Sequence, residues 1–340
     1  MIWHTWRQHR GQWLFVAAAL VVTAAVVILI GLSMHRAFVE MGVADCTAHL
    51  PPIVPTDAGP VDPDLLACAE LADAFLRQHG SGALGGVILL LLVPLLVGLV
   101  VGTHLVADDV DHGTHRLVWT QGVTRRHWSA AKLGLACTVA VVAAGAYGLL
   151  AHWYVAPMSS AGVGRLILTD LLGTAPVAYA LFAVALGAFS GATLRKVPPA
   201  LAATLFGFVV ARLAVRQARP HFLPPLERKL PVYWHPTQTD LGSPVSLRLT
   251  GDWDVNIQTY DAAGPLAGVT GGRFCPSPPS SSTPLDLACN TPEFGVAEYN
   301  LQLYHPDGRF WTFQLIETGI FVALAALLIL LTLRRIQRIT

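Results

Sequence analysis

Six long runs of apolar residues, separated by polar segments, dominate the pattern of the chain. Each run is close to the roughly 20 residues that an α-helix needs to cross the hydrocarbon core of a membrane. The runs predict transmembrane helices over 13–34, 82–107, 133–157, 171–194, 197–215 and 313–333. The expected fold class is therefore membrane all-α, with six transmembrane helices.

Basic residues gather at alternate ends of these runs. They precede the first run, lie between the second and third, fill the turn between the fourth and fifth, and follow the sixth. If the helices alternate in direction, all four groups lie on one side, and the positive-inside rule makes that side the cytoplasm. Both termini are then cytoplasmic. The first run is too long for a signal peptide and is expected to remain as an anchor.

The polar segments complete the expected organisation. Tryptophans and basic residues over 1–12 predict an interfacial amphipathic helix. The other segments are an extracellular loop over 35–81, a cytoplasmic loop over 108–132, an extracellular loop over 158–170, an extracellular domain over 216–312 and a cytoplasmic tail over 334–340.

Local patterns predict structure inside the two larger outer segments. A helix is expected to begin at Pro63, where apolar residues start to recur at helical spacing. Alternating apolar and polar residues predict strands over 245–249 and 255–260. A hairpin is expected from 299–304, through a turn at 306–308, to 309–311. The extracellular domain after the fifth helix should therefore contain β-structure.

Composition supports an integral membrane protein. Hydrophobic residues make up 54% of the chain and charged residues only 13%, which is far from the average of soluble domains. The formal net charge of +1 provides no strongly basic surface, so no nucleic-acid partner is expected. The partner that composition predicts is the lipid membrane.

Four of the five cysteines fall in the outer segments. Those in the first outer segment are Cys46 and Cys68, and those in the last are Cys275 and Cys289. Because the outer side of the membrane is oxidising, we expect each pair to form a disulfide. The alternative is that some of these cysteines are free thiols.

The chain lacks common catalytic and phosphate-binding motifs. It contains no G-x-x-x-x-G-K-[ST], no H-E-x-x-H and no G-x-S-x-G, so we expect no catalytic residue and no enzyme activity. His112 and His115 are one helical turn apart beside acidic residues, a spacing that suits a metal ion. Gly113 and Thr114 between them indicate a helix boundary, so solvated polar groups are the preferred interpretation and no metal is expected.

Two charged residues lie within the apolar runs. Arg212 is near the outer end of the fifth run, and Glu317 is about one turn inside the outer end of the sixth. Charged groups at membrane depth are costly and often functional. One hypothesis is a buried Arg212–Glu317 pair that holds an outer gate or contacts substrate. The alternative is two interfacial side chains that extend to water.

The stretch 108–126 is a densely patterned polar segment. Asp109 and Asp111 crowd the exit of the second run. Gly113 breaks the helix there, and Thr114 is a good N-cap for a short helix over 115–121. Apolar side chains on this helix indicate docking against a protein partner, with burial against other cytoplasmic parts of the chain as the alternative. The residues assigned to docking are Asp109, Asp111, Gly113, Thr114, His115, Arg116, Leu117, Val118, Trp119 and Arg125.

Two stretches carry a family resemblance. The first is 98–132, which contains Asp109-x-Asp111-x-Gly113-Thr114-x-Arg116, Thr120-Gln121, Thr124-Arg125 and Lys132. The second is 304–317. The first resembles ABC-2-type transporter permeases, the transmembrane subunits of bacterial ABC exporters, and the second is similar to a bacterial subgroup of them with a long last outer loop.

This resemblance implies one half of an exporter in a bacterial plasma membrane. It makes 108–132 a coupling loop, whose helix 115–121 binds a separate ABC ATPase subunit. ATP and Mg belong to that ATPase, and no cofactor is implied on this chain. A second permease is also implied, either another copy in a homodimer or a homologous chain. The alternative function is a membrane sensor, in which the outer domain binds a ligand and signals through an ATPase partner without transport.

Overall fold

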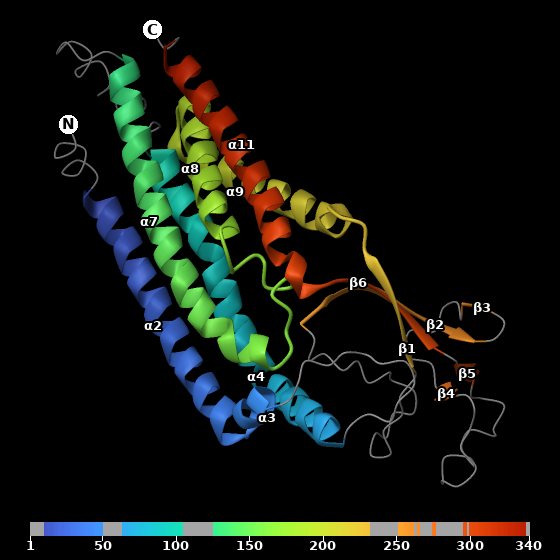
Figure 1. Cartoon of the computed structure of the whole chain (residues 1–340). Helices are drawn as coiled ribbons and strands as arrows, with labels where there is room; N and C mark the ends of the chain where they lie inside the picture. The colour runs from blue at the N-terminus through green and yellow to red at the C-terminus, as the bar shows by residue number, and fades with distance from the viewer. Residues whose placement is uncertain are drawn as a thin grey trace.

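A bundle of long helices, with a small group of strands beyond one end, makes up the molecule (Figure 1). The computed structural model describes residues 10–49, 63–104, 125–231, 251–261, 264–265, 274–276, 295–297 and 299–337. Six helices in this part of the chain are long and apolar enough to cross a membrane. The first of them begins, and the last ends, at the end of the bundle that lies away from the strands (Figure 1).

The helices differ in length, and this difference shapes the end of the bundle near the strands. We call this the outer end and the opposite end the inner end (Figure 1). At 1.5 Å per residue, the third spanning helix is about 54 Å long and the fourth about 30 Å. A hydrocarbon core is about 30 Å thick, so the third helix projects well beyond it. The helices are α2 (Arg10–Glu40), α3 (Val43–His49), α4 (Pro63–Val97), α7 (Arg125–Ser160), α8 (Ala175–Leu194), α9 (Val197–Ala218) and α11 (Phe310–Gln337), with the π-helical turn η1 (Gly98–Gly102) after α4 and the 3-10 turns η2 (Arg219–His221) and η4 (Asp307–Arg309).

The first outer segment contains more helix than its expected description as a loop over 35–81. Helix α2 reaches Glu40, α3 follows, and α4 already begins at Pro63. The helix expected at Pro63 is confirmed, but it runs without a break into the second span. Between Pro63 and Pro94 the sequence has no proline to stop a helix, which explains the continuity.

The cytoplasmic and second outer loops are also corrected. The loop expected over 108–132 is already helical from Arg125, where α7 begins. The extracellular loop expected over 158–170 is replaced by the end of α7 and by a connecting segment (residues 161–174) that folds back into the bundle. Its leucines at 166, 168, 171 and 172 are buried, because a run this apolar is more stable inside the protein than in water. Helix α8 begins only at Ala175, after Gly173 with a φ of 72°.

Four strands form an antiparallel sheet outside the bundle. The order is β1-β6-β2-β3, built from β1 (Leu226–Pro231), β6 (Tyr299–His305), β2 (Trp253–Asp261) and β3 (Gly264–Pro265), and a second, parallel pair joins β4 (Phe274–Pro276) to β5 (Gly295–Ala297). The strands expected over 255–260 and 299–304 are confirmed. The strand expected over 245–249 lies outside the described residues.

The hairpin expected at the end of this region is wrong. Residues 309–311 are not a strand, because η4 and the start of α11 occupy them. Strand β6 is already paired on one side with β1 and on the other with β2, so neither edge is left for a third partner. The polar turn at 306–308 therefore leads directly from the sheet into the last spanning helix.

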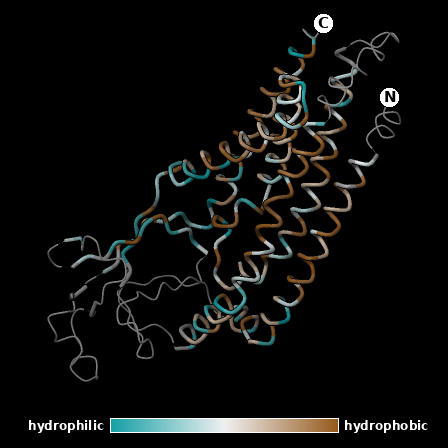
Figure 2. Tube along the Cα trace, turned by 180° about the vertical axis from the view of Figure 1, so that it is seen from behind, coloured by the Kyte–Doolittle hydropathy of each residue, from teal (hydrophilic) through white to brown (hydrophobic). Residues whose placement is uncertain are grey.

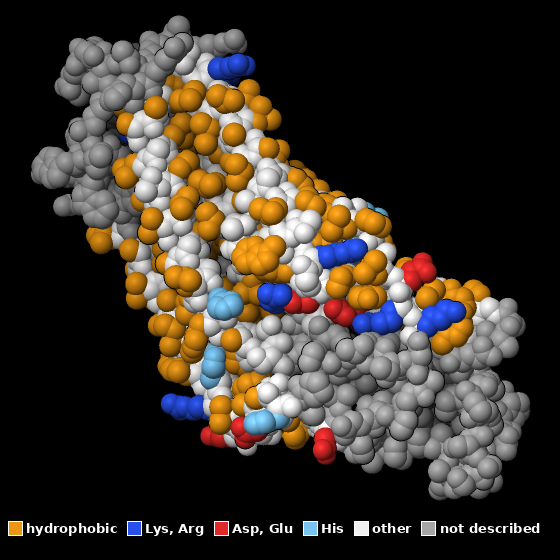
Figure 3. Space-filling view, in the orientation of Figure 1, with side chains coloured by type: hydrophobic (Ala, Val, Ile, Leu, Met, Phe, Trp, Pro, Cys, Tyr) orange, Lys and Arg blue, Asp and Glu red, His pale blue; other side chains and the backbone are white. Residues whose placement is uncertain are grey.

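An apolar surface surrounds the helices. Hydrophobic residues follow the helices in Figure 2, whereas the strand region is more hydrophilic. Charged side chains gather near the ends of the bundle in Figure 3, with apolar and uncharged groups between them. Large side chains such as Phe206 and Leu149 are 73% and 76% exposed, which is unusual for a soluble protein and fits contact with lipid.

In the inner half of the bundle, the backbone of η1, which continues α4, packs directly against the backbone of α8. A Cβ atom added to Gly98 would overlap the side chain and backbone of Ala183. A Cβ atom on Gly187 would lie 2.8 Å from the carbonyl oxygen of Gly98 and 2.8 Å from the backbone nitrogen of Thr103. Glycine allows this approach because it has no side chain. The three elements consequently pack with no space for larger residues.

Candidate functional site

Four charged residues meet near the outer end of the bundle, and we call them the ion cluster. Asp170 lies on the connecting segment, Arg212 on α9, Arg219 in η2 and Glu317 on α11. About 22 Å of helix separates Arg212 from the start of α9 beside Arg195, and about 25 Å separates Glu317 from Arg334. Because Arg195 and Arg334 lie near helix ends away from the strands, Arg212 and Glu317 lie in the outer half of the bundle.

Glu317 is the centre of the ion cluster. Its side chain is 0% exposed, and its Oε1 atom accepts hydrogen bonds from Arg219 Nη2 at 2.9 Å and from Arg212 Nη1 at 3.3 Å. The hydroxyl of Tyr179 on α8 donates a third bond to the same oxygen at 2.7 Å. Three elements, α8, α9 and η2, are thus tied to a single carboxylate oxygen of α11.

Asp170 completes the ion cluster from the connecting segment. Its Oδ1 atom lies 3.1 Å from Arg212 Nη2 and also accepts a hydrogen bond from Arg219 Nη2. Each arginine therefore contacts both carboxylates. Burial alone raises the pKa of Asp170, but the charges of the two guanidinium groups outweigh that effect and hold the pKa below its ordinary value. Asp170 is accordingly ionised at neutral pH.

An aromatic surface covers one side of Arg212. Its Cζ atom lies 3.6 Å from the centre of the Tyr179 ring, and Tyr179 packs edge-on against Phe321 of α11 at 4.9 Å between ring centres. A guanidinium group over an aromatic face is stabilised by the ring electrons, more strongly where water is excluded. The aromatic contact thus fixes the orientation of Arg212 toward the two carboxylates.

The charges of the ion cluster balance, but its hydrogen bonding is incomplete. Two arginines face two carboxylates, so no net charge is buried, which limits the cost of removing the groups from water. Among the described residues, Glu317 Oε2 and Arg219 Nε are buried and have no hydrogen-bond partner. Such orphaned atoms are rare in native structures and call for a further partner. Chemically, the cluster can bind elements together and accept one more polar group.

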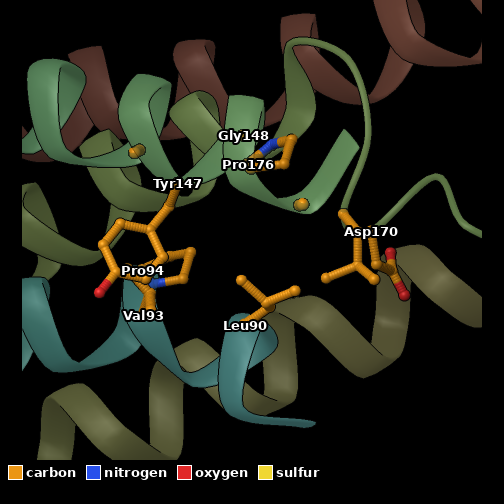
Figure 4. A pocket seen from close by; sticks show the side chains of 10 residues that line it. Leu90, Val93, Pro94, Tyr147, Gly148, Asp170 and Pro176 are labelled. Atoms are coloured by element: carbon orange, nitrogen blue, oxygen red, sulfur yellow. The ribbon is translucent and has the colours of Figure 1, made fainter. Parts of the chain in front are cut away.

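A small cavity lies beside Asp170. Figure 4 shows Leu90, Val93 and Pro94 of α4 facing Tyr147 and Gly148 of α7, with Pro176 and Asp170 completing the lining. The space open to the centre of a water-sized sphere is about 20 Å³, which suits one water molecule. This cavity is too small for a transported molecule in the present conformation. Within the described ranges, no group of three or more His, Cys, Asp or Glu residues is placed to hold a metal ion.

The structure brings together two pairs of residues selected from the sequence, Arg212 with Glu317 and Cys46 with Cys68. Arg212 and Glu317 are in direct contact, as the hypothesis of a buried pair supposes, although a role in gating stays a prediction. No local pattern in the sequence singles out Arg219, Asp170 and Tyr179. Asp170 was assigned to the edge of a water-facing loop, and Arg219 lay beyond the expected end of the fifth run. An arginine and an aspartate just outside a span are weak signals on their own.

The other selected residues lie partly or wholly outside the described part of the chain. This holds for the docking residues Asp109, Asp111, Gly113, Thr114, His115, Arg116, Leu117, Val118 and Trp119, for Cys289, and for the side chains of Arg125 and Cys275. Arg125 is placed by its backbone at the start of α7. Cys46 and Cys68 are joined by a disulfide with 5.6 Å between their Cα atoms, which links α3 to α4.

Together, the six apolar helices and the buried charges define a multi-pass helical membrane protein. A comparison with protein families narrows this class. Residues 17–219 match the family described as ABC-2 membrane transporter related, and this is more than half of the chain. The chain therefore belongs to the ABC-2 membrane transporter related family and is a permease of the plasma membrane.

The extent of the match separates two parts of the molecule. It includes Asp170, Tyr179, Arg212 and Arg219, and it ends before the strands and before α11 with Glu317. Permeases of this family are in general not enzymes, and they imply an ABC ATPase as a partner. No match was found among curated proteins, and none among solved structures.

Proposed function

We propose that this chain is the permease subunit of an ATP-driven exporter. It forms the substrate pathway with a second permease, either another copy of itself or a homologous chain, and is driven by a separate ATPase that binds ATP and Mg. The family match over 17–219 carries this proposal, because it covers five of the six spanning helices and the loop expected to dock the ATPase. A family of transporters favours transport, and no observation favours the sensor function.

The arrangement of the helix ends supports the position proposed for the ATPase. Helix α2 begins, α7 begins and α11 ends at one end of the bundle, away from the strands (Figure 1). The loop over 108–132 connects to α7 at that same end. Basic residues in this loop and after α11 agree with a cytoplasmic orientation. A helix over 115–121 is then accessible to a cytoplasmic subunit.

The ion cluster supports export by a pathway closed at its outer end. Its members come from the connecting segment, α9, η2 and α11, so separating these elements requires the ion pairs to break. When the elements separate, the charged groups of the ion cluster can pair with water or with other polar groups. We propose that the ion cluster is part of an outer gate that is shut in this conformation.

Affinity purification in mild detergent, followed by mass spectrometry, tests the proposed coupling. We expect the tagged chain to recover a nucleotide-binding subunit in near-equal amount. Trp119→Ala and Arg116→Ala should lower that recovery at least tenfold if helix 115–121 is the docking site. Arg77→Ala is the control, because Arg77 forms an exposed ion pair with Asp73 on the outer part of α4.

Recovery of the chain without any ATPase, in wild-type and variant forms alike, would overturn the proposal. Recovery of an ATPase with equal amounts in the wild type and in both docking variants would instead move the docking site elsewhere on the chain. ATP-dependent accumulation of a labelled compound in inverted membrane vesicles then identifies a substrate. Vesicles that carry Arg77→Ala should accumulate it at the wild-type rate.

A further inference from the structure

The connecting segment between α7 and α8 is irregular backbone buried at the outer end of the bundle. Loops normally lie on the surface, because their unpaired backbone groups need water, and at membrane depth irregular backbone is tolerated only inside protein. Leu171 is 4% exposed, and Leu166 and Thr169 are 0% exposed. The two leucines pack in the core that also contains Phe310 and Phe313. The segment therefore fills the space between the outer ends of the helices.

Gln314 of α11 attaches the connecting segment through four hydrogen bonds. Its Nε2 atom donates to the carbonyl oxygens of Thr169 at 3.1 Å and Leu172 at 2.9 Å. Its Oε1 atom accepts from the backbone N–H groups of Thr174 at 3.1 Å and Ala175 at 2.9 Å. One side chain thus satisfies both the irregular backbone and the first N–H groups of α8, which a helix cannot pair internally.

A second attachment joins the connecting segment to the strand region. The Nε atom of Arg165 donates to both carboxylate oxygens of Asp307, at 3.0 and 2.9 Å. The backbone N–H of Asp307 donates to Asp252 Oδ1 at 3.2 Å, and Asp252 Oδ2 accepts a bond from Arg228 of β1 at 3.2 Å. The ion pair is therefore continuous with strands β1 and β2 through Asp252.

Backbone contact reinforces this second attachment. A Cβ atom added to Gly164 would overlap the carbonyl group of Gly251, just before β2. The connecting segment and the strand region thus meet without a side chain between them. Movement of the sheet relative to the bundle must either carry this segment along or break the Arg165–Asp307 pair.

We infer that the connecting segment is the plug that seals the outer end of this permease, latched to α11 by Gln314 and to the outer sheet by the Arg165–Asp307 pair. Release of these latches, together with the ion cluster, opens the outer end of the pathway. The outer sheet is then part of the gate. The sealing of the bundle is inferred from the contacts of the described residues. The role of the connecting segment in transport rests on the proposed function.

Accessibility of a buried cysteine measures the seal without a known substrate. Leu171→Cys places a thiol on the buried side of the connecting segment, beside the small cavity. A membrane-impermeant maleimide is added to proteoliposomes containing the full chain, and labelling of the chain with Leu171 intact is subtracted as background. We expect slow labelling in the parent and at least tenfold faster labelling after Gln314→Ala or Arg165→Ala. Arg77→Ala, the exposed-pair control, should leave the rate unchanged.

A charge reversal separates a latch from a general loss of folding. Arg165→Asp alone and Asp307→Arg alone should each accelerate labelling, and the double variant should restore slow labelling because the pair is re-formed. Hydrogen exchange measured by mass spectrometry should rise over 161–174 in the single variants and stay unchanged in α7. Equal labelling rates in the parent and in all latch variants would overturn the proposal that the connecting segment is a plug.

The nucleotide dependence connects the plug to transport. In the complex with the ATPase, a non-hydrolysable ATP analogue should change the labelling rate of the Leu171→Cys chain at least tenfold. If the ATPase is recovered but nucleotide never alters labelling, the plug has no part in transport while the permease proposal stands. If no ATPase is recovered, the permease proposal fails, and the latch variants still decide whether 161–174 seals the bundle.

Discussion

The inner and outer halves of the helix bundle differ in the contacts that join α8 to its neighbours. In the inner half, α4 and η1 meet α8 through Gly98, Gly102 and Gly187, so that backbones touch. In the outer half, the helices are joined by the ion cluster and by the hydrogen bonds of Gln314. The first kind depends on the absence of side chains, and the second on the presence of particular ones.

This difference has a mechanical consequence. Close contact between glycines has no alternative arrangement, because any relative movement creates voids or overlaps in a densely packed interior. Polar contacts can be remade with water or with another partner. The inner half is thus suited to move as a unit with the cytoplasmic loop, and the outer half is suited to open. The four substitutions and conditions that follow separate these properties.

The largest effect is expected from Glu317→Leu. This change leaves the two arginines of the ion cluster sharing Asp170 alone, and removing one partner of a buried ion pair costs about 3–5 kcal/mol. We expect the free energy of unfolding in detergent to fall by about that amount. Asp73→Leu, which removes an ion pair that is 56% exposed on the Asp73 side, should cost less than about 1 kcal/mol. Equal losses would mean that the ion cluster does not hold the outer half together.

Gly98→Ala tests the inner half. The added methyl group overlaps Ala183, and overpacking of a dense interior costs about 1–3 kcal/mol. Gly145→Ala on α7 is the matched control, because a Cβ atom there meets nothing within 4 Å. Since alanine favours a helix over glycine, the control should gain about 0.5–1 kcal/mol. The thermal unfolding midpoint measures both changes. If Gly98→Ala raises the midpoint as Gly145→Ala does, the contact between Gly98 and Ala183 is not tight.

Acid should weaken the outer half by an intermediate amount. The pKa of Asp170 lies below its ordinary value of 3.8 because Arg212 and Arg219 favour the charged form. A group with a lowered folded-state pKa stabilises the protein above its ordinary pKa, and this stability is lost as the pH falls toward the folded-state value. The unfolding midpoint, measured over falling pH, should drop less steeply in Asp170→Asn than in wild type. Identical pH profiles in the two proteins would show that the ion pairs of Asp170 do not stabilise the folded state.

Tyr154→Phe removes a single uncharged hydrogen bond and should have the smallest effect on stability. The Tyr154 hydroxyl donates to the carbonyl oxygen of Ala83 at 2.9 Å and joins α7 to α4. Loss of one such bond costs about 1 kcal/mol, measured as a shift of the unfolding midpoint. Thr138→Val removes an exposed hydroxyl that bonds within its own helix and should change stability by less than about 0.5 kcal/mol. A loss in Tyr154→Phe as large as in Glu317→Leu would erase the distinction between ionic and neutral contacts.

Local patterns predicted the spanning helices well, because the hydropathy of about 20 consecutive residues suffices to identify a span. They predicted the ends of elements less well. The sequence around Arg309 resembles the second strand of a hairpin, yet pairing of β6 with β1 and β2 leaves the chain to enter α11 instead. Likewise, residues 161–174 look like a short connection in the sequence. Only their packing against distant parts of the chain, such as Phe310 and Phe313 of α11, explains why they are buried.

The residues of the candidate site could likewise be predicted only in part from the sequence. Arg212 and Glu317 were detectable because a charge inside an apolar run is conspicuous by itself. Asp170 and Arg219 lie just beyond apolar runs, where charges are ordinary, and their contacts join residues 49 and 98 positions apart. Gln314 gave no signal, because an uncharged amide near the end of a span has no local feature that reveals four partners.

The sequence by itself determined the six apolar runs that form the spans in the described part of the chain, and the two charges that enter them. It did so because the cost of placing polar backbone and charge in lipid is a local property of the residues. The tertiary structure decided that those two charges meet, that Asp170, Arg219 and Tyr179 join them, and that the connecting segment is buried between the helices. These depend on which helices lie side by side, and that follows from packing between distant parts of the chain.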